Sequence, residues 1–246
     1  MVAGDDDEAV DQGGRRKQAV DRGDGIDGVD PTPGVSGARP GGRRPQPHAS
    51  EAERSRYDRP MPDALHFTGD AEADALIAKD PLALLIGFAL DQQITVQAAF
   101  AGPLKLRQRL GSLDAATIAT SDPAELEALF RQQPAIHRFP GSMAKRVHDL
   151  AQHVADEYDG HAERVWTEAK DATDLEKRIR ALPGFGDMKV LALSAVLAKR
   201  FGVEVAKPLA PTFPTLGDVD SVEALHEYQA AKRAYKKARR EQLSSA

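Results

Sequence analysis

The stretch Leu182-Pro183-Gly184-Phe185-Gly186 decides the fold, because it joins two segments with helical periodicity. Apolar residues recur at helical spacing over 175–182, and a nearly uninterrupted apolar run occupies 190–197. Two glycines around one apolar residue permit a sharp turn and leave the backbone N–H groups uncovered, so a phosphate can approach them. The second helix would begin at Asp187, with the positive end of its dipole at the same place. The pattern favours a phosphate-binding helix-hairpin-helix over a purely structural turn.

The first sixty residues lack the residue types that build a core. They hold ten of the chain's twenty glycines, no leucine, no phenylalanine and one aromatic residue, Tyr57. Because so little apolar area cannot offset the entropy of ordering, we expect residues 1–60 to be a disordered tail. The tail is either an upstream extension of a protein that starts at Met61 or a mixed-charge segment that contacts nucleic acid or a partner. We expect neither a secretory signal nor a membrane-spanning segment.

The rest of the chain has the size of one helical domain over 61–221, followed by a basic C-terminal helix over 222–246. Alternating β-branched runs are missing, so the sequence predicts an all-α fold. Helices are expected over 71–79, 82–90 and 94–110, and Trp166 is expected to anchor the core. Further helices would begin at capping residues. The candidate caps are Ser112 or Asp114, Asp122, Ser142, and Asp171 or Thr173.

Composition restricts the chemistry that the chain can perform. It contains no cysteine, which excludes disulfides, thiol catalysis and a cysteine-bound iron–sulfur cluster. The formal net charge is −5, so any surface that binds DNA must be a local basic patch. The candidate bases for such a patch are Lys145, Arg146, Lys189, Lys199 and Arg200, with Lys232, Arg233, Lys236, Lys237, Arg239 and Arg240 near the C-terminus. The C-terminal group either contacts DNA or forms a solvated helix face.

The order of these features resembles the HhH-GPD superfamily of base-excision DNA glycosylases. In that family a buried helix ending in a glutamine-containing turn is followed by a lysine-bearing helix, then the Leu-Pro-Gly-apolar-Gly hairpin, then a loop with a catalytic aspartate. Residues 84–95, with Gln92 and Gln93, look like the first feature, and residues 139–147, with Lys145, look like the second. The resemblance covers roughly residues 75–205 and implies a two-lobed helical fold.

The resemblance also implies how the chain would handle DNA. A glycosylase extrudes its target base from the stack, and Gln93 best matches the glutamine that fills the gap. The alternative is that Gln92 and Gln93 only cap a helix end. The backbone N–H groups of Gly184 and Gly186 would hold the DNA strand, and Lys189 would contact phosphate. A monovalent cation on the hairpin carbonyls is plausible by family resemblance, with no other cofactor and no metal held by side chains.

The catalytic carboxylate is where the chain departs from the family. Family spacing places the aspartate near residues 206–208, where the sequence has Ala-Lys-Pro. The nearest carboxylates are Glu204, Asp218 and Asp220, which we take as candidates because a carboxylate must stabilise the cationic sugar or activate water. Capping of a helix start is the alternative role for Asp218 and Asp220.

The position of the family's Schiff-base lysine, two residues after the second hairpin glycine, is occupied by Met188. We therefore expect a monofunctional glycosylase that excises a damaged or mismatched base, acts on double-stranded DNA as a monomer, and resides in the cytoplasm with the nucleoid. One alternative is an inactive protein that binds lesions or DNA structures. Another is a helical protein-interaction domain.

Overall fold

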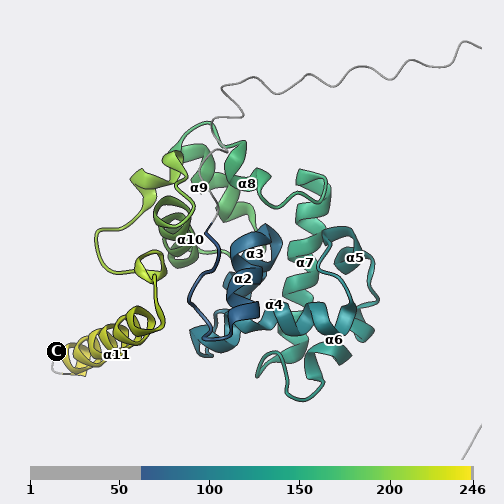
Figure 1. Cartoon of the computed structure of the whole chain (residues 1–246), viewed down its shortest axis with the longest axis horizontal. Coiled ribbons are helices and arrows are strands. Elements are labelled where there is room, and N and C mark those ends of the chain that lie inside the picture. Colours follow the sequence, from purple (N-terminus) through teal and green to yellow (C-terminus); the bar gives the residue numbers. More distant parts are fainter. Residues whose placement is uncertain (1–61, 245–246) are drawn as a thin grey trace, which may run out of the picture. The chain divides into compact units, whose positions relative to one another are not determined.

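The computed structural model of the chain describes residues 62–244, with side chains as far as residue 234 (Figure 1). Within these residues every regular element is a helix, which confirms the all-α prediction. The predictions made for residues 1–60 lie outside the described residues. None of the helices in the described part combines the length and the apolar character needed to cross a membrane.

Most helices begin after a capping residue whose side chain accepts hydrogen bonds from the first free backbone N–H groups of the helix. Asp80, for example, accepts from the N–H groups of Leu82 and Ala83. Of the paired alternatives proposed as caps, the structure uses Asp114 and Asp171. The helices are α2 (Ala71–Lys79), α3 (Pro81–Leu90), α4 (Val96–Leu110), α5 (Ala115–Thr120), α6 (Pro123–Arg131), α7 (Pro140–Tyr158), α8 (Arg164–Thr167), α9 (Ala172–Ala181), α10 (Asp187–Lys199) and α11 (Val222–Ser244), with 3-10 turns η1 (Glu204–Leu209) and η2 (Leu216–Asp218).

Three starting points differ from the sequence prediction. Helix α3 begins at Pro81 rather than at residue 82, with Asp80 as its cap. Helix α4 begins at Val96 rather than at residue 94, because Thr95 accepts the N–H of Ala98 as the cap. Helix α7 begins at Pro140, two residues before the expected Ser142, since proline is tolerated in the first turn where its missing N–H costs nothing. Trp166 is buried as expected.

Helix α3 is the centre of the fold. All of its residues after Pro81 are buried, and it packs against α2, α4 and α7 (Figure 1). At Gly87 the helix comes so close to Phe100 of α4 that an added Cβ would lie 2.4 Å from the ring. The rings of Phe88 and Phe100 then meet edge to face at 5.1 Å. This contact fixes α3 against α4, the two helices that flank the glutamine-containing turn.

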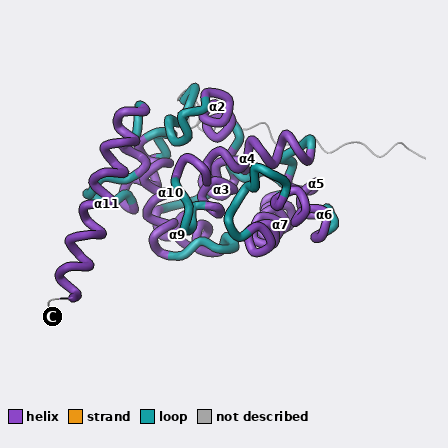
Figure 2. Tube along the Cα trace, turned by 90° about the horizontal axis from the view of Figure 1, so that it is seen from below, coloured by secondary structure: helices purple, strands orange, loops and turns teal. Residues whose placement is uncertain are grey.

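The other helices pack around this pair in two groups. Helices α5 and α6 both pack on α7, whereas η1 and η2 pack on α10. Gly217 of η2 lies directly on the backbone of α10, where an added Cβ would be 2.5 Å from the carbonyl oxygen of Ala195. Helix α11 follows η2 and runs away from α10 as a separate helix (Figure 2).

Candidate nucleic-acid interface

The hairpin between α9 and α10 leaves its glycine amides uncovered. Gly184 has a φ of +83°, a conformation that favours glycine. Leu182 and Phe185 are buried and anchor the turn. No side chain in the described part of the chain caps the start of α10, where Gly186 is the N-cap residue. The first N–H groups of α10 are therefore available to an anion at the positive end of the helix.

Arg146 of α7 lies against this hairpin. Its side chain is so close that a Cβ added at Gly184 would be 2.7 Å from Cδ. Lys145, the predicted DNA contact, instead has a side chain that is 76% exposed and an ion pair with Asp149 at 2.7 Å. The structure thus brings Arg146 to the hairpin and leaves Lys145 beside Asp149. A guanidinium next to exposed backbone amides is a good partner for a phosphate.

Asp187 places a negative charge at the start of α10. Its carboxylate forms an ion pair with Arg180 of α9. An acidic residue in the first turn stabilises the helix dipole, although its charge repels an incoming phosphate. The pairing with Arg180 reduces this repulsion.

The turn over residues 91–95, here called the Gln turn, connects α3 to α4. Gln93 at its centre is exposed and has a φ of +55°. This left-handed backbone costs a residue other than glycine roughly 1–3 kcal/mol, and such strain is concentrated at functional sites. The structure thus presents Gln93, rather than Gln92, as an exposed side chain between two rigid helices.

His137 holds the Gln turn from the loop before α7. Its Nδ1 accepts the N–H of Phe139 at 3.0 Å, so Nε2 carries the proton and donates to the carbonyl of Gln92 at 3.0 Å. Burial lowers the pKa of His137, and Arg138 and Arg146 lower it further. The hydrogen bonds to the carbonyls of Gln92 and Leu90 oppose this decrease. The neutral ring is the form that fits these contacts, since a proton on Nδ1 would displace the N–H of Phe139. Phe139 itself is 41% exposed beside the turn.

Lys189 connects the hairpin helix to the end of α3. Its Nζ donates to the carbonyl of Ala89 at 3.1 Å and lies 5.4 Å from the ring centre of Phe185. Burial lowers the pKa of Lys189 to about 8, with Arg146 adding to the decrease and Asp91 opposing it. The hydrogen bond to Ala89 uses one of the three donors of the Lys189 ammonium, so two remain for a phosphate. Met188 points outward and is 71% exposed.

The three candidate carboxylates lie after α10. Glu204 pairs with Lys207 at 2.6 Å, and Asp220 is exposed between η2 and α11. Asp218 accepts from Thr215 in a capping box and pairs with Lys199 at 2.8 Å. Burial raises the pKa of Asp218, but Lys199 and Thr215 lower it more. Lys199 ends α10, about 18 Å along the helix from the hairpin.

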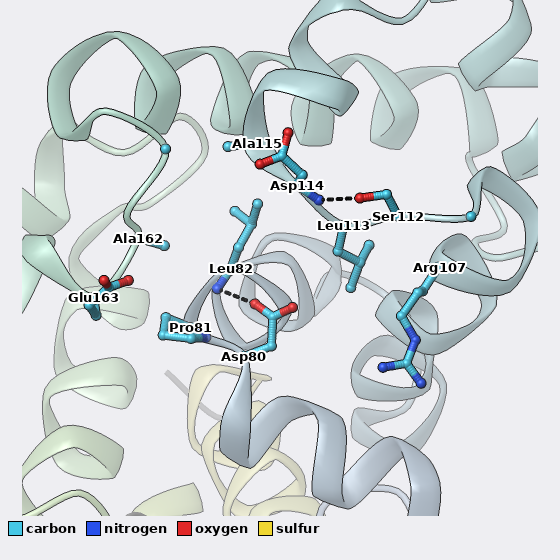
Figure 3. A pocket seen from close by; sticks show the side chains of 12 residues that line it. Asp80, Pro81, Leu82, Arg107, Ser112, Leu113, Asp114, Ala115, Ala162 and Glu163 are labelled. Carbon is cyan, nitrogen blue, oxygen red and sulfur yellow. Dashed lines mark hydrogen bonds between the residues drawn. The ribbon is translucent and has the colours of Figure 1, made fainter.

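A polar pocket of about 410 Å³ lies at the opposite end of α3 (Figure 3). Asp80, Arg107, Asp114 and Glu163 surround it, and Asp80 and Asp114 also cap α3 and α5. The ten residues of α3 separate this pocket from the Gln turn by about 15 Å. The pocket therefore lies apart from Gln93, the proposed wedge residue that enters the DNA stack.

Helix α11 contacts the first turn of α4, directly after the Gln turn. The amide of Gln229 donates to Oε1 of Gln97 at 2.7 Å, and Tyr228 packs against the core. Burial raises the pKa of Tyr228, and the charge of Asp91 raises it further. Lys232 lies over the ring of Tyr228. The basic helix therefore contacts, through Gln229, the first turn of the helix that follows Gln93.

A comparison with protein families matches residues 86–245 to the model of the HhH-GPD superfamily base excision DNA repair protein. The chain belongs to this superfamily. The match confirms the resemblance, and base excision DNA repair and DNA binding follow from membership. Comparisons with curated proteins and with solved structures gave no match.

Sequence reasoning on this HhH-GPD protein named Arg146 only as one of several candidate bases, and it missed two other contributors to the interface, His137 and Asp91. The signal for Asp91 was its position directly before Gln92. No local signal marks His137, because its partner lies 45 residues away in the sequence.

Proposed function

We propose that this HhH-GPD protein is a monofunctional DNA glycosylase that flips a damaged or mismatched base out of double-stranded DNA and hydrolyses its N-glycosidic bond. The juxtaposition of wedge and hairpin carries the proposal. The hydrogen bond from Lys189 to the carbonyl of Ala89 ties the first turn of α10 to the helix that ends at the Gln turn. One strand can then be held at the hairpin while Gln93 enters the stack.

Water rather than an enzyme amine is proposed as the nucleophile. The lysine of bifunctional relatives is replaced by Met188, whose thioether cannot form an imine. The neighbouring Lys189 holds its Nζ at the backbone carbonyl of Ala89, one position beyond the residue that carries the lysine in bifunctional relatives. The products would be a free base and an intact strand with an abasic site.

The hairpin carbonyls are compatible with the monovalent cation that the family resemblance suggests. The carbonyl of Leu182 accepts one backbone N–H, from Phe185, and retains a lone pair for an ion, whereas the carbonyl of Gly186 already accepts the N–H groups of Lys189 and Val190. We propose a single chain acting in the nucleoid, with no iron–sulfur cluster.

An inactive lesion-binding protein is the second candidate. The observation in its favour is that Asp218 and Glu204, two of the three candidate carboxylates, are held in ion pairs with Lys199 and Lys207. Such a protein would keep the hairpin and wedge for recognition and lack base release.

Duplexes with one uracil, hypoxanthine, 3-methyladenine, thymine glycol or 8-oxoguanine test the proposal. We expect free base from at least one duplex, strand scission only after alkali, and no adduct with borohydride. A trapped adduct that disappears in Lys189→Ala would exclude the monofunctional mechanism. Binding of lesions without any base release would favour the inactive protein.

A further inference from the structure

The Gln turn begins with a carboxylate, Asp91, that follows the last residue of α3. Asp91 is the C-cap residue of α3, and it caps the helix with its backbone: its N–H donates to the carbonyls of Gly87 at 3.1 Å and Phe88 at 3.3 Å. The Asp91 side chain is half-buried. Because the cap uses only the backbone of Asp91, its carboxylate is available for another role.

Three other elements surround this position. Helix α10 sends Lys189 to the carbonyl of Ala89, two residues before Asp91, at 3.1 Å. Helix α4 begins after the turn, and α11 is bonded to it through Gln229 and Gln97 at 2.7 Å. The charge of Asp91 acts on the Lys189 amine and on the Tyr228 hydroxyl, raising the pKa of each, although burial has the larger effect on both.

The carboxylates after α10 are less well placed. Asp218 is held by Lys199 at the far end of α10, and Glu204 pairs with Lys207 beyond that end. Asp91, by contrast, is two residues from the wedge residue Gln93 and beside the first turn of the hairpin helix. A base extruded at Gln93 would therefore leave the stack close to this carboxylate.

We propose that Asp91 is the catalytic carboxylate of the glycosylase reaction, a role that rests on the function proposed above. The C1′–N bond breaks first, and its electron pair leaves with the base, which takes up a proton from solvent. The negative charge of Asp91 stabilises the cationic sugar that remains. A water oxygen then bonds to C1′ while the Asp91 carboxylate accepts a proton from that water, and Asp91 later releases this proton to solvent.

Asp91→Asn tests the role, because it removes the charge and keeps the size. The lesion duplex that the wild-type protein processes best is used under single-turnover conditions, and binding is measured with a duplex that contains a tetrahydrofuran abasic analogue. We expect base release to fall about 100-fold or more with binding within twofold. Asp156→Asn, an exposed residue of α7, is the matched control and should keep the wild-type rate.

Asp91→Ala with added sodium formate separates chemistry from folding. A small carboxylate that enters the vacated space should restore part of the rate, which a merely structural role of Asp91 does not predict. The proposal is overturned if Asp91→Asn releases base at a rate within threefold of wild type. It is also overturned if base release is lost only in Asp218→Asn, Asp220→Asn or Glu204→Gln. A wild-type protein that releases no base from any duplex overturns the glycosylase function itself, and the role of Asp91 with it.

Discussion

Substitution of Gly186 by aspartate should weaken DNA binding without harming the fold. A Cβ at Gly186 meets no atom within 4 Å, and its φ of −100° suits any residue. Aspartate is also a good N-cap, so its carboxylate would itself accept the N–H groups that a phosphate needs. Losing one charge-assisted contact costs roughly 1.5–3 kcal/mol, which corresponds to roughly a 10- to 150-fold increase in Kd.

The assay is a salt titration of duplex affinity. The slope of log K against log salt should fall in magnitude by about 0.9 if the phosphate held at the hairpin, which the adjacent Arg146 neutralises, is lost. Ala116→Asp adds the same charge in the first turn of α5, beside the pocket at the other end of α3, and should leave affinity unchanged. Gly184 is a poorer test, because its positive φ and the closeness of Arg146 would strain the fold. Equal affinities and slopes for wild type and Gly186→Asp, with equal Tm, would refute the hairpin as a phosphate site.

Three further measurements probe other parts of the molecule. A chain that starts at Met61 should keep its Tm and any rate of base release, and a lower Tm would contradict the tail assignment. The folded-state pKa of His137 lies below its unfolded value near 6.5, so its contribution to stability is present above that pH and is lost as pH falls towards the folded pKa. Urea unfolding from pH 8 to pH 5 should show this loss, and His137→Asn should flatten the dependence. Lys232→Glu with Arg233→Glu should weaken duplex affinity at low salt if α11 contacts DNA, whereas no change assigns these bases to a solvated face.

Much of the interface could be anticipated because its signals are local. The hairpin is specified by Gly184 and Gly186 together with the apolar spacing around them, which fixes a turn without distant partners. The start of α10 at Asp187 follows from the same stretch and agrees with the structure. Aspartates that cap helix starts accept hydrogen bonds from amides two or three residues away, so they too can be predicted from the sequence.

The choice between neighbouring side chains could not be read in this way. Lys145 and Arg146 are adjacent, and only the packing of α7 against the hairpin turns Arg146 towards Gly184. Lys189 was expected to contact phosphate, and its second partner could not be foreseen. The structure brings its Nζ to the carbonyl of Ala89, because the first turn of α10 faces the end of α3.

The sequence alone determined the all-α class, the helix-hairpin-helix and the glutamine-containing turn, since each depends on residues within one or two helical turns. Only the tertiary structure decided what stands around that turn. His137 reaches Gln92 across 45 residues, and Lys189 reaches Ala89 across 100. Contacts of this kind depend on how rigid helices pack, and packing is set by complementary surfaces distributed over the whole chain rather than by any local pattern.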